Sequence, residues 1–335
     1  MTAPAVRPLR ITIAGASSLL GREITELFSS SSLPPHDLSL LDDAALEGTV
    51  REAGGEPALV HALVPGSFEG SRLAFFAGIE EFTTRHWAEA ERAGAAVIDL
   101  SGGLAGVREA MPSIPSLDAT LGPRRASPRS LFRSPGAAVI VSATLSTALR
   151  FLPVRRIAAT FLLPVSDRDQ AGIQELEAQT ASLLSFQPIV REVYDAQVAF
   201  NLLDRYGVLS REPLEDVRAR IARGVSDYLG YRAPMPAIQV IQAPVFYGAA
   251  FTVYVEFDGP MAADALQTAL TAGGVVVTED SPSNASAAGS SEICVTLRTD
   301  VNLPMVWWIW GVVDNVRLAA QNAVRIAERI CATGK

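Results

Sequence analysis

The pattern of apolar and polar positions near the start of the chain predicts a strand, a glycine turn and a helix. Residues 9–14 alternate between apolar and polar side chains and lead directly into Gly15. Segment 19–28 then places its apolar residues on one helical face and its charged residues outside that face. Further short apolar segments, typical of strands, lie at 38–41, 73–76, 95–100 and 138–141. Helical spacing separates several of these segments, so we expect a parallel sheet, whose neighbouring strands need crossover connections.

The pattern changes after about residue 150. Helical spacing recurs at 170–184 and 214–225. Strands are predicted at 157–163, 238–243, 251–257, 275–278 and 293–298. Residues 251–257 alternate strictly, which is typical of an antiparallel strand with one face solvated or covered by helices. The Ser-, Ala- and Asn-rich segment 279–292 predicts a flexible loop, and an amphipathic helix closes the chain.

Composition narrows the class of protein. A length of 335 residues suggests two domains, and 49% hydrophobic residues supply ample apolar surface for a core, which excludes global disorder. A net charge of −8 argues against binding to nucleic acid or to an anionic membrane. No uncharged apolar run reaches the roughly 18 residues of a membrane span, and the first ten residues lack the apolar core of a signal peptide. We therefore expect a cytoplasmic protein.

Cysteine and histidine are too sparse for a disulfide framework or a zinc site. Two cysteines, Cys294 and Cys331, lie in a predicted strand and a predicted helix, and packing roles suit both better than nucleophilic ones. Three scattered histidines add no metal-binding cluster, so we expect no metal. Trp307, Trp308 and Trp310 predict an aromatic strand in a core or at a subunit interface.

The segment Gly15–Gly21 lies where a dinucleotide-binding loop would lie, between the first strand and the first helix. Its pattern has two outer glycines, with Ser18 where a middle glycine usually lets the backbone approach the phosphates. A tight turn without a ligand is the alternative. About 20 residues further on, Asp42 and Asp43 end the second strand, where a carboxylate can bind a ribose hydroxyl and repel a 2′-phosphate. The alternative is two aspartates in an ordinary loop.

Several short motifs follow in a defined order, nearly from end to end of the chain. They are Phe75-Phe76-Ala77-Gly78, Val97-Ile98-Asp99-Leu100-Ser101, Gln170-Ala171-Gly172-Ile173-Gln174-Glu175-Leu176, Ala199-Phe200-Asn201, Ala243-Pro244-Val245-Phe246-Tyr247-Gly248 and Asp314-Asn315-Val316-Arg317. Together with the Gly15–Gly21 loop, this series resembles the aspartate-semialdehyde dehydrogenase family, most closely its Usg-like paralogous branch.

The resemblance implies an α/β fold. Residues 1–142 would form a Rossmann-like dinucleotide-binding domain, and residues 143–312 an α+β mixed-sheet domain for catalysis and dimerisation. A helix at 313–332 would return to the first domain. The chain would then pair into a homodimer and bind NAD or NADP weakly, with NAD favoured because of Asp42 and Asp43. The implied cofactor contacts are Gly15, Ser17, Ser18, Leu19, Leu20, Gly21, Ala77, Gly78 and Asn315.

Residue by residue, the family's catalytic groups do not carry over. The Pro-Asn-Cys-Ser/Thr stretch matches 142–146, which puts Thr144 in the position of the cysteine, or Ala143 if the register shifts by one. The acid/base histidine becomes Ala249. The two arginines that hold substrate and phosphate become Gln242 and Ala105. The Ser-Gly-Ala-Gly turn beside the nicotinamide resembles the charged stretch 166–169.

These losses predict a non-catalytic homologue that keeps some nucleotide or ligand binding, with an unidentified protein partner as a further option. A threonine hydroxyl without an adjacent base cannot perform thioester chemistry. One alternative is an oxidoreductase with changed chemistry, in which Asp167, Arg168 and Asp169 converge on a new site. Another is an active aspartate-semialdehyde dehydrogenase whose site residues lie elsewhere in the chain.

Overall fold

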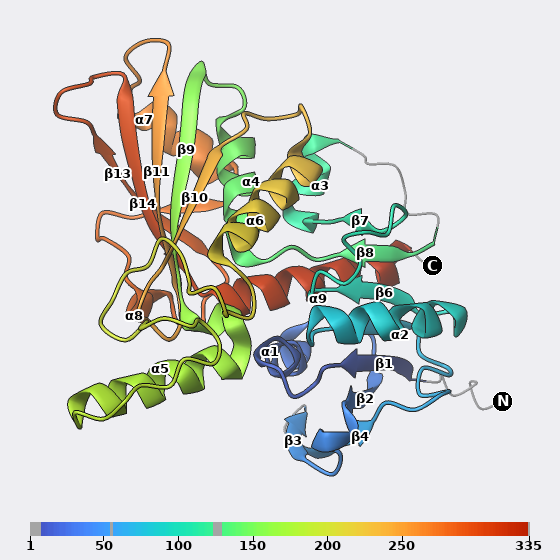
Figure 1. Ribbon diagram of the computed structural model, residues 1–335. Coiled ribbons are helices and arrows are strands. Elements are labelled where there is room, and N and C mark those ends of the chain that lie inside the picture. The colour runs from blue at the N-terminus through green and yellow to red at the C-terminus, as the bar shows by residue number, and fades with distance from the viewer. Residues whose placement is uncertain (1–7, 54–55, 123–128, 334–335) are drawn as a thin grey trace. The chain divides into compact units, whose positions relative to one another are not determined.

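An eight-stranded sheet organises the first of two structural units. In the computed structural model, which describes residues 8–53, 56–122 and 129–333, the strand order is β3-β4-β2-β1-β5-β6-β8-β7 (Figure 1). The strands are β1 (Leu9–Ala14), β2 (His36–Asp42), β3 (Val50–Ala53), β4 (Glu56–Ala62), β5 (Leu73–Phe76), β6 (Ala96–Asp99), β7 (Met111–Pro112) and β8 (Leu131–Arg133). All neighbours are parallel except β3 and β4, which pair antiparallel. The predicted parallel sheet is confirmed.

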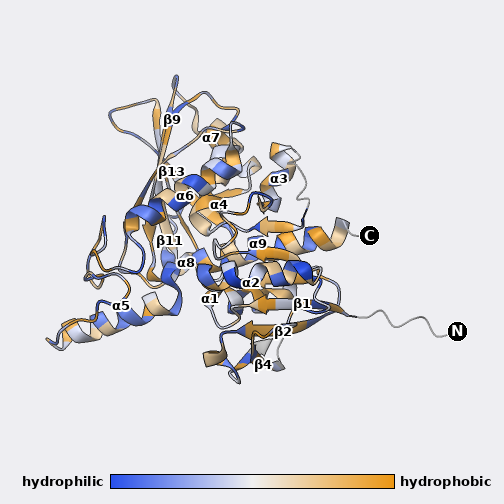
Figure 2. Ribbon diagram, turned by 45° about the vertical axis from the view of Figure 1, so that its right-hand side comes forward, coloured by the Kyte–Doolittle hydropathy of each residue, from blue (hydrophilic) through white to orange (hydrophobic). Residues whose placement is uncertain are grey.

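Helices cover both faces of this sheet. One apolar cluster packs the sheet against α1 (Leu19–Leu27) and the later part of α9 (Asn315–Thr333). A second cluster, on the other face, packs it against α2 (Glu80–Arg92). Strand β1 is largely hydrophobic, whereas α2 exposes hydrophilic residues (Figure 2). This arrangement is the Rossmann-like architecture that the alternation of strands and helices predicts.

A mixed six-stranded sheet organises the second unit, in the order β10-β9-β11-β14-β13-β12. Its strands are β9 (Val154–Leu163), β10 (Ala237–Gln242), β11 (Ala249–Phe257), β12 (Val275–Val277), β13 (Ile293–Thr299) and β14 (Val306–Val313). The two edge pairs, β9–β10 and β12–β13, are parallel, and the three central pairs are antiparallel. The antiparallel prediction for 251–257 is therefore confirmed on both sides of β11.

Helices cover one face of the second sheet. The helices of the second unit are α4 (Ala137–Leu149), α5 (Asp169–Leu184), α6 (Leu214–Leu229), α7 (Ala263–Ala272) and the short α8 (Asn284–Ala287). Of these, α4, α6 and α7 pack on β9, β10 and β12, over buried side chains such as Phe161, Phe251 and Ile309. The alternate residues of β11 and β14, among them Thr252, Tyr254 and Trp308, project from the opposite face.

Each of the two units is built from more than one segment of the chain. Residues up to Asp118, the segment Gly122–Pro135 and residues from Ala319 onward belong to the first unit. Residues 119–121, at the end of α3 (Pro115–Leu121), and Gly136–Leu318 belong to the second. Helix α4 therefore opens the main part of the second unit, and α9 begins in the second unit and continues in the first.

Two expectations need correction. Residues 138–141 are not a strand; they lie in α4, all thirteen residues of which are buried. A helix buried on every side has no polar face, so its short apolar runs cannot be told from a buried strand by periodicity. Segment 279–292 is not wholly loop either, because it contains α8, whose Ser283 and Ser286 form a reciprocal capping box. Trp310 further ties this segment by donating its indole N–H to the carbonyl of Pro282 at 3.0 Å.

Candidate functional site

The loop that follows β1 has room only for glycine at its two ends. Gly15 has a φ of +84°, and a Cβ on it would lie 2.2 Å from the backbone nitrogen of Gly78. A Cβ on Gly21 would lie 2.4 Å from the carbonyl oxygen of Gly15. The loop after β1 and the loop after β5, which contains Ala77 and Gly78, are therefore in direct backbone contact.

Ser18 takes the place of the usual middle glycine and has a structural role of its own. It is the N-cap of α1, and its hydroxyl accepts a hydrogen bond from Gly21 N at 2.9 Å. The same hydroxyl donates to the carbonyl of Ala77 at 2.8 Å. Leu19 and Leu20 follow as the first residues of α1. A serine here links the two loops where a glycine could not.

The loop also contains a buried polar atom without a partner. The hydroxyl of Ser17 lies among buried atoms and has no hydrogen-bond partner among the described residues. Such a group is costly unless a ligand satisfies it. It lies beside the N-terminus of α1, which carries the partial positive charge that favours a phosphate. The loop therefore fits a dinucleotide pyrophosphate, as the sequence pattern predicts.

Asp42 supports this loop from the adjacent strand. One carboxylate oxygen accepts the backbone N–H of Ser17 at 2.8 Å, and the other accepts that of Asp43 at 3.0 Å. Asp42 is buried and Asp43 is exposed. The carboxylate that the sequence assigns to a ribose hydroxyl is thus engaged with the protein backbone.

Thr144 does not occupy a position where a nucleophile could work. It lies in the middle of α4, is 4% exposed, and donates its hydroxyl hydrogen to the carbonyl of Ile140 at 2.8 Å. Ala143, one residue earlier, is fully buried in the same helix. An interior helical hydroxyl bonded to its own backbone is a packing feature.

The positions matched to the histidine and one arginine lie in the second sheet, on the two strands that flank β9. Gln242 ends β10 and is 1% exposed; its amide group donates to the carbonyls of Leu163 and Ala243, and its oxygen accepts the Tyr206 hydroxyl at 2.6 Å. Ala249 begins β11 and is also 1% exposed. All the hydrogen-bonding capacity that Gln242 shows is therefore used inside the fold.

Asn315 connects the turn at 166–169 with the turn that precedes Ala249. Its side-chain oxygen accepts the N–H of Gly248 at 3.1 Å. Its amide nitrogen donates to the Ser166 hydroxyl at 3.0 Å and to the Asp167 carboxylate at 2.7 Å. Asn284 from α8 holds the same turn from another side, donating to the carbonyl of Gly248 at 2.5 Å. Asn315, a predicted cofactor contact, thus has all of these partners within the second unit.

Arg168 is committed to a neighbouring acid and not to Asp167. Its guanidinium pairs with Glu212, lies 5.7 Å from the Tyr206 ring centre, and shares Glu212 with Arg220 at 3.2 Å. Burial by itself would raise the pKa of Glu212, but Arg220 and Arg168 outweigh it and hold that pKa below its usual value. Asp169 has a φ of +55°, a conformation that favours glycine, where the family turn has glycine.

Ala105 lies in a surface turn of the first unit that is organised by Asp99 at the end of β6. The buried Asp99 carboxylate accepts the backbone N–H groups of Ser101 at 2.8 Å and Leu104 at 2.8 Å, as well as the Ser101 hydroxyl at 2.7 Å. Burial raises the pKa of Asp99 against the opposing effect of these hydrogen bonds. Ala105 itself is exposed and supplies no charge.

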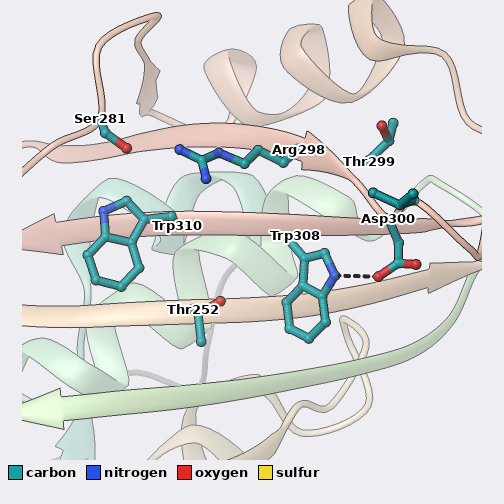
Figure 3. A pocket seen from close by; sticks show the side chains of 8 residues that line it. Thr252, Ser281, Arg298, Thr299, Asp300, Trp308 and Trp310 are labelled. Atoms are coloured by element: carbon teal, nitrogen blue, oxygen red, sulfur yellow. Dashed lines mark hydrogen bonds between the residues drawn. The ribbon is translucent and has the colours of Figure 1, made fainter.

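A pocket that the sequence did not indicate lies on the open face of the second sheet. It has a volume of about 500 Å³ and is lined by Trp308 and Trp310 from β14, Arg298 from β13 and Thr252 from β11, among others (Figure 3). The Trp308 indole N–H donates to Asp300 at 2.9 Å. Only the pairing of the strands brings these residues together, so periodicity alone could not have identified the pocket.

The described ranges contain neither a metal-binding cluster nor a helix able to span a membrane. No group of three or more His, Cys, Asp or Glu side chains there is arranged to hold a metal ion. None of the described helices combines the length and apolar character needed to cross a bilayer. Cys294 and Cys331 are free, half-buried thiols whose pKa values burial raises.

The fold and the glycine loop define a two-unit α/β protein with a Rossmann-like first unit. The family described as semialdehyde dehydrogenase, dimerisation domain, matches residues 146–318. A USG-1 protein homolog of Pseudomonas aeruginosa is 33% identical over 96% of this chain and 97% of its own length. The chain belongs to the semialdehyde dehydrogenase family, and the resemblance to its Usg-like branch is confirmed.

Other relatives extend the comparison. An aspartate-semialdehyde dehydrogenase of Synechocystis is 25% identical over 98% of both chains. A solved structure of a probable aspartate-semialdehyde dehydrogenase from Pseudomonas aeruginosa matches with a TM-score of 0.85 and 33% identity, covering 97% of this chain and 98% of that one. Aspartate semialdehyde dehydrogenase II of Vibrio cholerae, at 24% identity and a TM-score of 0.84, shares the fold.

Proposed function

We propose that this chain is a non-catalytic member of the semialdehyde dehydrogenase family that acts as a homodimeric dinucleotide-binding protein. The observation that carries the proposal is the state of the positions matched to the catalytic groups. Ala249 has no titratable group, Gln242 is buried and engaged by Leu163, Ala243 and Tyr206, and the position matched to the cysteine has no thiol. Nucleophile, base and anion-binding groups act as a unit, so their joint loss removes the chemistry.

The nucleophile position has a second match that suits the local structure better. The family's Pro-Asn-Cys can be aligned with Pro135-Gly136-Ala137, where β8 leads into the N-terminus of α4. A helix N-terminus lowers the pKa of a thiol and so favours a reactive cysteine. We therefore assign the nucleophile position to Ala137 and not to Thr144. Neither register supplies a sulfur atom.

The alternative of an oxidoreductase with new chemistry finds no support in the charged turn. Arg168 is paired with Glu212, and Asp167 accepts the Asn315 amide, so the two do not form a free acid–base pair. The alternative of an active enzyme with a relocated cysteine fails for a similar reason. Cys294 lies within β13 and Cys331 near the end of α9, and the pKa of each thiol is raised.

Activity assays test the non-catalytic proposal. The purified chain is incubated with aspartate semialdehyde, phosphate and either NAD or NADP, and absorbance at 340 nm is compared with that of an active family member. We expect turnover at least about 10⁴-fold below the active enzyme. The variant Gly15→Ala, prepared in parallel, reports contaminating host enzyme. Wild-type turnover above that of the variant would overturn the proposal.

Dinucleotide binding is proposed for the first unit. The glycine contact between Gly15 and Gly78, the Ser18 cap and the unpartnered Ser17 hydroxyl support it. Relatives include an aspartate semialdehyde dehydrogenase of Candida albicans solved with NADP, at 14% identity. The expectation that NAD is preferred rests on Asp42 and Asp43, and Asp42 is already engaged by backbone N–H groups.

The homodimer is proposed to form through the open face of the second sheet. Tyr254 and Trp308 pack edge to face there, with ring centres 5.4 Å apart, and Trp308 is 38% exposed. Aromatic side chains of this kind are enriched at the centres of interfaces. The matched family region, which includes these strands, is described as a dimerisation domain. A stable pair would bury more than about 1,000 Å².

Light scattering with matched variants tests the dimer. At micromolar concentration the wild type is expected at twice the mass of one chain. Trp308→Glu should give a folded monomer, because a carboxylate would be buried in the interface. Phe151→Glu, at an 84% exposed position outside this face, should remain dimeric. A monomeric wild type, or a dimeric Trp308→Glu, would overturn this part of the proposal.

A further inference from the structure

The pocket on the open face of the second sheet contains an arginine that is free to bind an anion. Arg298 lies on β13 directly opposite Trp308 of β14 in the strand register. Among the described residues, its guanidinium has no partner in an ion pair or a hydrogen bond. Figure 3 shows the side chain extended along one side of the pocket, toward Ser281 and Trp310.

The acids that share this face are already engaged by other groups. The Glu256 carboxylate accepts hydrogen bonds from two arginines of β9, Arg155 at 3.1 Å and Arg156 at 3.4 Å. Asp300 accepts the indole N–H of Trp308 at 2.9 Å and two backbone N–H groups of the turn between β13 and β14. Neither carboxylate is therefore left to neutralise the guanidinium in the pocket.

Two indole rings give the pocket an aromatic surface. Trp308 and Trp310 are two residues apart on β14 and so project from the same face of the sheet. Figure 3 shows Thr252 of β11 lying between the two rings. The volume of about 500 Å³ is in the range of small-molecule sites, which are lined mainly by apolar and aromatic groups with a few polar ones. A planar ring would have favourable contacts here.

A buried hydroxyl beside the pocket also lacks a partner. Thr296 lies on β13 opposite Trp310 and, two residues before Arg298, on the same face. It is 6% exposed, and its hydroxyl has no hydrogen-bond partner among the described residues. Such a group is costly unless another molecule satisfies it. A hydroxyl and a guanidinium are thus both available for oxygen atoms next to the indole rings.

We propose that this pocket is a binding site for a small planar aromatic carboxylate. The ring would lie against Trp308 and Trp310, and the carboxylate would accept paired hydrogen bonds from Arg298. Arginine suits this role because its planar guanidinium matches two carboxylate oxygens with parallel hydrogen bonds. The site belongs to the second unit, whereas the glycine loop belongs to the first, so the inference does not depend on dinucleotide binding.

The proposed homodimer gives a further reason for an anion in this pocket. Trp308 belongs to the face proposed to pair, and pairing would bury its cross-strand neighbour Arg298 as well. A buried guanidinium without a counter-charge is unfavourable, and the two acids of this face are engaged within their own chain. We therefore expect the ligand to stay bound when two copies pair, and this last step rests on the proposed homodimer.

Calorimetry on the full chain tests the site with 2-naphthoate, its neutral analogue 2-naphthamide and the non-aromatic cyclohexanecarboxylate. We expect 2-naphthoate to bind about tenfold more tightly than either of the others, or better. Arg298→Gln should remove the preference for 2-naphthoate over 2-naphthamide. Thr252→Phe, which fills the space between the indoles, should weaken 2-naphthoate at least about tenfold. Having two variants on different strands guards against the failure of either to fold.

Arg223→Gln is the matched control. Arg223 is an exposed arginine of α6, a helix that packs on β10, and its substitution should leave the affinity for 2-naphthoate unchanged. A loss equal to that of Arg298→Gln would show a nonspecific charge effect and overturn the inference. Equal binding of 2-naphthoate and 2-naphthamide by the wild type would also overturn it.

Light scattering on the same samples separates this inference from the homodimer. We expect twice the mass of one chain with 2-naphthoate bound. Binding of 2-naphthoate to a monomer would overturn the homodimer and leave the site intact. A dimer that binds no 2-naphthoate would overturn the site and leave the homodimer intact. Dissociation of the dimer by 2-naphthoate would show that the second copy fills the pocket, and would overturn the inference.

Discussion

The side chain of Glu175 attaches a long irregular connection to helix α5. It is buried, and one carboxylate oxygen accepts the backbone N–H groups of Glu192 at 2.8 Å and Val193 at 2.5 Å. The other oxygen accepts the side-chain amide of Gln179 at 3.1 Å. Gln179, one turn further along, binds the same connection through the carbonyl of Ala196 at 2.9 Å. The connection from α5 to α6 therefore depends on two adjacent side chains of one helix.

We predict that Glu175→Gln destabilises the second unit by about 2–4 kcal/mol. Glutamine has nearly the same shape, but it replaces one acceptor oxygen by a donor. Whichever way the amide turns, at least one set of donors loses its partner, and each buried donor left unpaired costs about 1–3 kcal/mol. Hydrogen bonds to a charged acceptor are also among the stronger ones, at about 1.5–3 kcal/mol each.

Urea unfolding at pH 7, followed by tryptophan fluorescence, measures this effect. Three of the four tryptophans lie on β14, so the signal reports mainly on the second unit. Glu177→Gln is the control, because Glu177 lies on the same helix but is exposed, and its substitution should change stability by less than about 0.5 kcal/mol. Hydrogen exchange should also become faster at residues 192–194. A Glu175→Gln variant as stable as Glu177→Gln, with unchanged exchange, would refute the reasoning.

Three further predictions concern the loop, the charged turn and the lost nucleophile. Gly15→Ala should abolish dinucleotide binding and lower the free energy of unfolding more than Gly70→Ala does. Both glycines have positive φ, but only at Gly15 would an added Cβ clash with backbone atoms. Equal losses of stability in urea titrations would contradict this. The pKa of Glu212 is lowered in the folded state, so its ion pairs should stabilise the protein at pH 7, and this contribution should fade as the pH falls below about 4.5. Glu212→Gln should remove that part of the pH dependence of the unfolding free energy. An unchanged pH dependence in the variant would count against the pairing. Thr144→Cys and Ala137→Cys should each remain inactive with aspartate semialdehyde, because Ala249 supplies no base; activity in either variant would show that a thiol alone suffices.

Part of the fold could be predicted from the sequence because burial on one face leaves a periodic record. The strict alternation at 251–257 marks a strand whose odd-numbered side chains pack under helices, and β11 has that structure. The glycines at 15 and 21 could be predicted for a related reason, since a backbone-to-backbone contact admits no side chain. Both signals can be detected in the residue types, one as an alternation of apolar and polar side chains and the other as glycine.

The remaining features depend on partners that are distant in sequence. Helix α4 is buried on all sides, so the polar face that would have marked it as a helix does not exist. The sequence offers Asp42 either a ribose hydroxyl or an ordinary loop, and the structure adds a bond that the sequence does not indicate, because the carboxylate accepts the N–H of Ser17 from another loop. A residue type states which bonds a side chain can form, and the tertiary structure decides which of them it forms. For that reason the sequence determined the family and the glycine loop, whereas the engagement of Asp42 by the backbone and the burial of α4 on all sides were decided only by the packing of strands and helices.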